Sequence, residues 1–268
     1  MKQLTNDNFL KSFEEREYAA DEGILYIAFG HSFTLEGIMS YKSLRRYMPD
    51  IPVCFMTDAP ESLADIEDPS LITVKIVPQH IRSKVDFVGL TPFRKTLYLD
   101  SDTLIVRDVS DIFQSLDRFD VALTHDYARK RTKYSNIVPE YERIPYAFSE
   151  VNGGVFGFNA NKRTEDFLQL WKEYFYKYFQ QTNGWDQVSL RISLWESDVK
   201  LFHMPFEYNI RSQANREKQD RFKHEFGEQH MAPRIYHMHY SPEVHQGKFN
   251  ITTLEELEKS ILEQAVWY

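Results

Sequence analysis

Two aspartates separated by one serine, Asp100 and Asp102, stand inside the apolar stretch TLYLDSDTLIV. Side chains two residues apart on a strand point to the same face, so the two carboxylates are expected to lie together. Burying carboxylates beside Leu and Ile costs roughly several kcal/mol per ion unless a cation or strong donors compensate. Carboxylate oxygens suit Mg²⁺ or Mn²⁺, which keep coordination positions for water and for substrate phosphates. The motif therefore predicts a metal ion that bridges the protein to a departing diphosphate.

Two alternatives to this metal site fit the same motif. A strand end followed by a turn, with Asp102 as a cap, would need no ligand, but the apolar TLIV that follows is unlike a polar loop. The motif also fits the Asp-x-Asp-x-Thr signature of haloacid-dehalogenase-like phosphatases, in which the first aspartate is the nucleophile. Those phosphatases carry the signature on their opening strand, whereas about three strands are expected before it here. No downstream Gly-Asp-x-x-x-Asp pair completes their metal site.

The pattern of apolar residues predicts strands and helices in alternation. Strands buried on both faces are expected at 23–30, 52–58 and 71–78, before the strand that ends at Asp100, with a helix at 32–48 and a cationic, partly helical segment at 79–95. The second half has strands at 119–126, 153–160 and 234–240 and amphipathic helices at 163–180 and 186–196. Helices are also expected at 5–20 and about 253–264. This order predicts an α/β fold with a mostly parallel central sheet, flanking helices and a smaller mixed second half, in one domain spanning 1–268.

The composition limits the class of protein. A net charge of −8 argues against general nucleic-acid binding, which needs a basic surface. The one cysteine, Cys54, cannot form an internal disulfide or a cysteine-rich zinc site. The polar N-terminus has no apolar signal-peptide core, and no run reaches the roughly 18 uncharged residues that a bilayer span needs. These observations predict a soluble, cytoplasmic protein without a transmembrane segment.

A set of motifs along most of the chain adds a resemblance. The stretches are ILYIAFG, PVCFMTD, TPFRKTLYLDSDTLIVRDVSDIF, VNGGVFGFNA, WDQVSL and RIYHMHY, in this order over residues 23–245. Together they resemble the GT-A-fold nucleotide-sugar glycosyltransferases, most closely the family-8-like group that contains glycogenin and the bacterial lipopolysaccharide galactosyltransferases. The resemblance implies a GT-A (Rossmann-like) fold and a nucleotide-sugar donor. It is specific for the fold and the donor class, and much less so for the sugar.

The resemblance implies roles for residues at the metal and the nucleotide. Asp100 and Asp102 match the metal-binding Asp-x-Asp, completed by a late histidine that is His237 or His239. The two histidines would share a strand face, so the spacing does not choose between them. The nucleotide positions are Ala28, Phe29 and Gly30 at the first-strand turn that receives uracil and ribose, Ser101 at the ribose, and Lys84, with Arg82 as its neighbour, at the diphosphate. For Lys84 a solvated helix face is an equally good interpretation.

The remaining matches surround the donor sugar. Asn152, Gly153 and Gly154 match a turn whose polar atoms border the sugar, although Asn-Gly is also a strong hairpin signal. Asp186 and Gln187 match the family's Asp-Gln at a helix start, where the pair meets the reacting face of the transferred sugar; an N-cap is the alternative for Asp186. Asp126 is a looser match to a residue that binds donor hydroxyls.

One family feature is missing from this sequence. The family ends with His, Gly and then Lys-Pro-Trp, whose lysine grips phosphate, whereas this chain has HMHYSPEVHQGKF. Lys248 and His245 are the nearest substitutes in the sequence. The closure over the diphosphate is therefore expected to differ from that of the family.

These features predict a metal-dependent enzyme that transfers a hexose from a UDP-sugar to a hydroxyl of a glycan, lipid-linked or protein acceptor, with Mn²⁺ or Mg²⁺ as cofactor. The closest family retains anomeric configuration. The departing phosphate would then deprotonate the acceptor while Asp186 or Gln187 stabilises positive charge on the sugar; inversion would need one of them as a general base. The alternatives are a catalytically degenerate nucleotide-sugar-binding protein, the phosphatase described above, and a nucleotidyltransferase. A nucleotidyltransferase would need a Gly-rich loop after the first strand, and the segment FGHSFT at that place in this chain is not such a loop.

Overall fold

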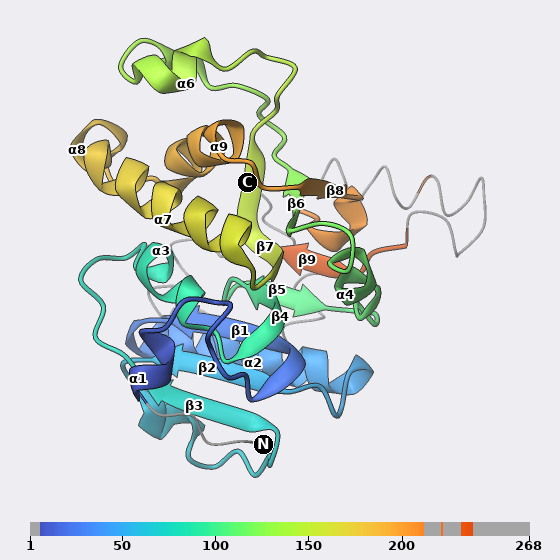
Figure 1. Ribbon diagram of the computed structural model, residues 1–268. Coiled ribbons are helices and arrows are strands. Elements are labelled where there is room, and N and C mark those ends of the chain that lie inside the picture. The colour runs from blue at the N-terminus through green and yellow to red at the C-terminus, as the bar shows by residue number, and fades with distance from the viewer. Residues whose placement is uncertain (1–5, 212–220, 222–231, 238–268) are drawn as a thin grey trace.

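A seven-stranded sheet in the order β3-β2-β1-β4-β7-β6-β8 runs through the molecule (Figure 1). The computed structural model describes residues 6–211, 221 and 232–237. The strands of this sheet are β1 (Ala20–Ala28), β2 (Val53–Thr57), β3 (Leu71–Lys75), β4 (Phe93–Leu99), β6 (Val121–His125), β7 (Val151–Asn159) and β8 (Leu201–Met204). All neighbouring pairs are parallel except those of β7, which is antiparallel to both β4 and β6. The predicted α/β class with a mostly parallel sheet is confirmed.

Helices connect the strands and cover the sheet. They are α1 (Asn6–Phe9), α2 (Gly30–Tyr47), α3 (Lys84–Phe87), α4 (Asp111–Ser115), α5 (Thr132–Ser135), α6 (Pro139–Arg143), α7 (Lys162–Lys177), α8 (Phe179–Thr182) and α9 (Asp186–Glu196), with short 3₁₀ helices η1 (Pro60–Leu63), η2 (Val88–Leu90) and η3 (Phe206–Tyr208). The helices predicted at 32–48 and 186–196 are confirmed as α2 and α9, and the one at 163–180 as α7 with the start of α8. Helices α7 and α9 lie side by side (Figure 1, yellow and orange).

Strands β1 and β2 are buried on both faces, as their continuous hydrophobic runs predicted. The same prediction is wrong for β3, which lies at the edge of the sheet and is only partly buried. In β1, Leu25 and Ile27 pack into one core with Trp171 of α7, whereas Tyr26 packs into a second core with Leu44 of α2. A third, smaller core joins α5 and α6 to α9. Burial on both faces fixes the register of each strand and therefore the positions of the residues that follow it.

The N-terminal segment differs from the helix predicted at 5–20. Among the described residues of this segment, α1 ends at Phe9 and the chain then turns. The guanidinium of Arg16 is buried and donates to the carbonyl oxygens of Phe9 and Gly89, and Phe13 packs into the core beside it. In a continued helix the N–H of Phe13 would donate to the carbonyl of Phe9. Here Phe13 donates instead to Glu165 and the Phe9 carbonyl accepts from Arg16, so tertiary contacts override the local helical preference.

A two-stranded antiparallel sheet, β5 (Thr103–Ile105) with β9 (Ile235–His237), lies beside the main sheet. It confirms the strand predicted at 234–240 over the part that the structure describes; its other residues, and the helix predicted at 253–264, lie outside the described residues. No helix in the described ranges is both long enough and apolar enough to cross a membrane.

Candidate active site

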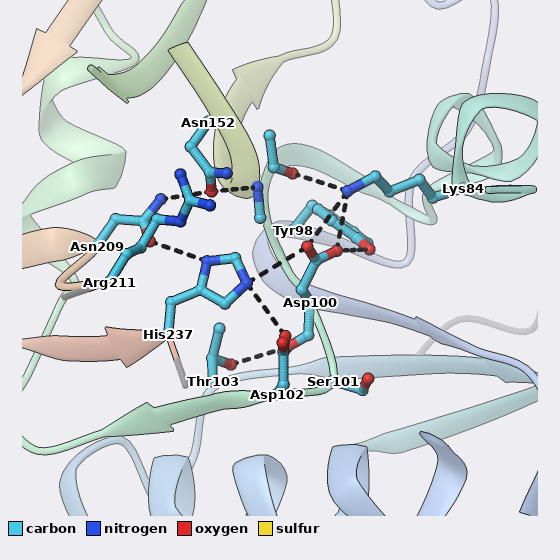
Figure 2. A network of polar contacts seen from close by, with 12 residues as sticks. Lys84, Tyr98, Asp100, Ser101, Asp102, Thr103, Asn152, Asn209, Arg211 and His237 are labelled. Carbon is cyan, nitrogen blue, oxygen red and sulfur yellow. Dashed lines mark hydrogen bonds and ion pairs between the residues drawn. The ribbon is translucent and has the colours of Figure 1, made fainter. Parts of the chain in front are cut away.

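Two carboxylates and one imidazole meet where β4 ends. The Nε2 atom of His237 lies 3.1 Å from Oδ1 of Asp102 and 3.7 Å from Oδ2 of Asp100. Each of the three residues offers one potential metal-ligand atom, and these three atoms lie within 4.8 Å of one another. The His237 side chain is 1% exposed, and those of Asp100 and Asp102 are 21% and 19% exposed. Figure 2 shows the imidazole facing both carboxylates.

The two sheets bring these residues together. Asp100 follows β4 directly, and its N–H donates to the carbonyl of Gly154 on β7 at 2.8 Å. The chain then turns into β5, in which Thr103 pairs with His237 of β9, so the histidine is placed beside Asp102. A residue more than 130 positions away in the sequence therefore completes the Asp-x-Asp group through strand register. His237 occupies the predicted place, and His239 lies outside the described residues.

A relay of amides orients the imidazole. Nδ1 of His237 lies 3.0 Å from Oδ1 of Asn209, whose Nδ2 donates to Oδ1 of Asn152 at 2.8 Å. Oδ1 of Asn152 also accepts the N–H of Gly154. Because Asn209 presents an oxygen to Nδ1, this nitrogen donates its proton to Asn209, and Nε2 is left facing the two carboxylates.

A buried lysine lies on the other side of Asp100. Nζ of Lys84 is 3.0 Å from Oδ1 of Asp100 and 3.4 Å from Oδ2 of Asp186 at the start of α9. Tyr98, two residues before Asp100 on β4, donates its hydroxyl to Oδ1 of the same aspartate at 2.5 Å. The interpretation of Lys84 as part of a solvated helix face is therefore wrong, since its side chain is only 9% exposed. Arg82 lies farther out, with Nε 3.8 Å from Oδ1 of Asp186.

The charges of this group support one another. Burial by itself raises the pKa of Asp100, but Lys84 and His237 outweigh it and hold the pKa below its usual range. Burial likewise lowers the pKa of Lys84, and Asp100 and Asp186 outweigh it, so that its pKa lies above the usual value. The carboxylate and the ammonium both carry charge, as a site for an anionic ligand and a cation requires.

The donor set fits a divalent ion of the kind the sequence predicted. Two carboxylates and one imidazole nitrogen suit Mn²⁺. They also suit Mg²⁺, although Mg²⁺ binds nitrogen ligands less readily than oxygen ligands. Space for the group depends on Gly154, because a Cβ atom at this position would lie 2.1 Å from Cε1 of His237 and 2.7 Å from Oδ2 of Asp100. The residues Asp100, Asp102 and His237 are thus the ones that would hold the metal.

A cavity of about 360 Å³ opens in front of these residues. Its wall combines the acidic motif and Lys84 with Ala28 and Phe29 from the end of β1. Ser101 also contributes to the wall. Gly30, the third predicted residue of the first-strand turn, is not among the lining residues; it has φ +75° and donates its N–H to Asp58 at 2.7 Å. The left-handed backbone explains why this turn carries a glycine.

Glu36 on α2 adds a carboxyl group behind the metal-binding residues. Its Oε2 accepts a long hydrogen bond of 3.5 Å from the hydroxyl of Ser101, which points away from His237 in Figure 2. Burial, and next to it the charge of Asp102, raise the pKa of Glu36 to about 8. Near neutral pH this carboxyl is therefore largely protonated.

We expect Glu36→Gln to stabilise the metal-free protein above about pH 8 and to change little at about pH 4. The folded pKa of about 8 exceeds the ordinary 4.5, so ionisation favours the unfolded chain and the penalty grows as pH rises between these values. A gain of roughly 1–2 kcal/mol, or a few degrees in Tm, is expected after discounting for solvent screening. Thermal unfolding followed from about pH 4 to pH 9, with exposed Glu67→Gln as control, measures it. A variant no more stable than wild type at high pH contradicts the prediction.

The other predicted residues gather at the adjacent ends of β6, β7 and α9. Asp126 follows β6; its buried carboxylate is paired with Arg131 at 3.1 Å and with Arg211. Gln187 in the first turn of α9 donates from Nε2 to Oε2 of Glu150 at 2.7 Å. Gly153 lies beneath the same turn, where an added Cβ would lie 4.0 Å from Nζ of Lys84. Asp186 is the first residue of α9 and faces Lys84, whereas the N-cap residue is Trp185, so the interpretation of Asp186 as an N-cap is wrong.

Several residues of this region were not predicted. Tyr98 could have been found, because it shares a strand face with Asp100. Asn209, Glu150, Arg131 and Arg211 lie in loops or beside strand ends, and no spacing in the sequence relates them to the motif. Their positions depend on how loops fold over the sheet.

A comparison with protein families bears on this geometry. The family model described as nucleotide-diphospho-sugar transferase matches residues 95–250, which include the Asp-x-Asp motif and His237. The chain belongs to this family. The resemblance predicted from the motifs is confirmed, and transfer of a glycosyl group from a nucleotide sugar is the activity of the nucleotide-diphospho-sugar transferases. No curated protein sequence matches the chain.

Solved structures share the fold of this nucleotide-diphospho-sugar transferase. The galactosyltransferase LgtC, in complex with donor and acceptor sugar analogs, is 14% identical with a TM-score of 0.57, and the match covers 88% of this chain and 99% of LgtC. The glycosyltransferase GlyE from Streptococcus pneumoniae TIGR4 is 18% identical with a TM-score of 0.58, over 92% of this chain and 66% of GlyE. Mouse xyloside xylosyltransferase 1 is 12% identical with a TM-score of 0.53, over 81% and 97% of the two chains. The predicted GT-A fold is confirmed.

Proposed function

We propose that this transferase uses a UDP-hexose as donor, requires Mn²⁺ or Mg²⁺, and transfers the hexose with retention to a hydroxyl of a glycan, lipid-linked or protein acceptor. The observation that carries the proposal is the group formed by Asp100, Asp102 and His237, which lines a cavity together with Ala28 and Phe29. A metal ion held by the three residues supplies Lewis-acid stabilisation of the departing diphosphate.

Two cationic side chains, those of Lys84 and Arg82, neutralise the remaining negative charge of the diphosphate. Lys84 lies beside the metal-binding residues, and Asp186 holds it there from the opposite side. Arg82, on the same wall of the cavity, is 43% exposed and adds a second positive charge at its rim. These two residues offer phosphate neutralisation in a sequence that lacks the family's Lys-Pro-Trp. We assign the nucleotide to the wall of Ala28 and Phe29.

The sugar is assigned to the space bordered by Asn152, Gly153, Asp126 and the first turn of α9. In this arrangement Gln187 stabilises positive charge that develops at the anomeric carbon. The carboxylates of Asp186 and Glu150 are engaged with Lys84 and with Arg131, so neither is well placed to act as a nucleophile or base. The phosphate oxygen that leaves with UDP then accepts the proton of the acceptor hydroxyl, which corresponds to retention.

The direct test combines binding with turnover. Titration calorimetry of UDP with and without Mn²⁺ measures whether the nucleotide site depends on metal. Release of UDP from UDP-glucose, UDP-galactose and other UDP-sugars, first with water as acceptor, identifies the donor. Proton NMR of the released or transferred sugar then gives its anomeric configuration.

The outcomes separate the proposal from its alternatives. Metal-dependent UDP binding with UDP release from at least one donor supports it. Binding without release from any donor, with or without added saccharide acceptors, would indicate the degenerate binding protein. No UDP binding in either condition refutes the UDP-sugar donor, and other nucleotide sugars would be tested next.

A further inference from the structure

A buried carboxylate without a predicted role lies against Gln187. Glu150 precedes β7 and is 1% exposed. Its Oε2 accepts hydrogen bonds from Nε2 of Gln187 at 2.7 Å and from Nη1 of Arg131, and its Oε1 accepts the hydroxyl of Tyr141. Side chains from the segment before α5, from α6 and from α9 therefore converge on one carboxylate.

The chemistry of this contact fixes the direction of the Gln187 amide. An ionised carboxylate can only accept hydrogen bonds, so the NH₂ group of Gln187 must face Glu150 and the amide oxygen must point the other way. Arg131 compensates the negative charge of Glu150 and is itself shared with Asp126. In the described part of the chain, Oε1 of Gln187 takes part in no hydrogen bond, so this oxygen is available to a ligand.

We infer that Glu150 is a positioning residue that holds Gln187 with its amide oxygen toward the donor sugar. The inference rests on the proposed function, since it assigns the oxygen to the anomeric carbon of the transferred hexose. An amide oxygen carries partial negative charge and stabilises positive charge at that carbon, whereas the NH₂ group would oppose it. Without an acceptor at residue 150, the amide could rotate and present either end.

Two substitutions of Glu150 by side chains of similar size distinguish its role as a hydrogen-bond acceptor from a role in packing alone. Glu150→Gln keeps an oxygen toward Gln187 and Arg131 and turns its NH₂ to the Tyr141 hydroxyl, so we expect UDP-sugar turnover within about threefold of wild type. Glu150→Met has no comparable acceptor, and we expect turnover to fall roughly 10- to 100-fold while UDP affinity changes less than about threefold. Tyr141→Phe, which removes the other contact of Glu150, is the control and should stay within about threefold.

A double-mutant cycle tells positioning from general structural damage. In a Gln187→Ala background, Glu150→Met should cause no further loss beyond about twofold, because the group it orients is absent. The inference is overturned if Glu150→Met costs the same factor in both backgrounds, if it leaves turnover unchanged, or if Glu150→Gln loses as much as Glu150→Met.

The hydrogen bond of the Gln187 amide can also be tested in the ligand-free wild-type protein, so this test does not depend on the folding of a variant. Gln169 donates from Nε2 to Glu173 at 3.0 Å on the exposed face of α7, so it makes the same kind of bond without burial. By NMR, the side-chain amide protons of Gln187 should exchange with solvent at least about 100-fold more slowly than those of Gln169. Equal exchange rates overturn the inference. A wild type that releases no UDP from any donor instead refutes the proposed function, and the inference falls with it.

Discussion

Asp102→Asn is expected to abolish the metal-dependent part of UDP binding and to lower UDP-sugar turnover at least about 1000-fold. Asparagine keeps the size of the side chain but removes the charge that, with Asp100 and His237, holds the ion. Calorimetry with UDP in the presence and absence of Mn²⁺, and an assay of UDP release, measure the two effects. Without Mn²⁺, residual UDP binding through Lys84 should be unchanged within about threefold.

The same variant should not unfold, which makes its loss of activity interpretable. The charge of Asp102 raises the pKa of both Asp100 and Glu36, so removing it relieves repulsion in the metal-free protein. This gain offsets the lost contact with His237, and the melting temperature is expected near that of wild type. Asp65→Asn, at an exposed turn, is the matched control. Metal-dependent UDP binding by Asp102→Asn equal to that of the control would contradict the assignment of the metal site.

The sequence predicted those parts of the site that follow from strand order. Asp100 and Asp126 each follow a strand that is recognisable by its apolar run, and the carboxyl ends of parallel strands meet at one edge of an α/β sheet. Asn152 stands at the start of β7, whose antiparallel direction brings this start to the same edge. His237 could be predicted as a candidate because a short late strand carries it. Pairing with β5 then places it opposite Thr103, which no pattern in the sequence shows.

The parts that the sequence did not predict depend on side chains that meet across loops. Asn209 reaches His237 from the segment after η3, and Arg131 reaches Glu150 from the segment before α5. The predicted helix at 5–20 failed for the same reason, since the buried guanidinium of Arg16 finds its partners in single carbonyl oxygens of Phe9 and Gly89. Periodicity reports the burial of whole faces, whereas each of these contacts involves one polar atom.

Gly154→Ala is expected to disrupt the metal site although the residue has no functional group. The added Cβ would lie 2.1 Å from Cε1 of His237 and 2.7 Å from Oδ2 of Asp100, so at least one ligand must move. His237 is buried and held by Asn209, which leaves the imidazole little room. We expect Mn²⁺-dependent UDP binding to weaken at least about 10- to 100-fold and the protein to lose about 1–3 kcal/mol of stability.

A second glycine of the same chain provides the control for this substitution. A Cβ at Gly89 would meet Cδ1 of Leu168 at 3.7 Å, an ordinary contact, so Gly89→Ala should keep Mn²⁺-dependent UDP binding and change stability by less than about 1 kcal/mol. Adding His237→Ala to Gly154→Ala removes the closest clash, so the double variant should recover stability without recovering metal-dependent binding. If Gly154→Ala binds UDP and Mn²⁺ as well as Gly89→Ala does, then the close packing of β7 against His237 is not what shapes the site.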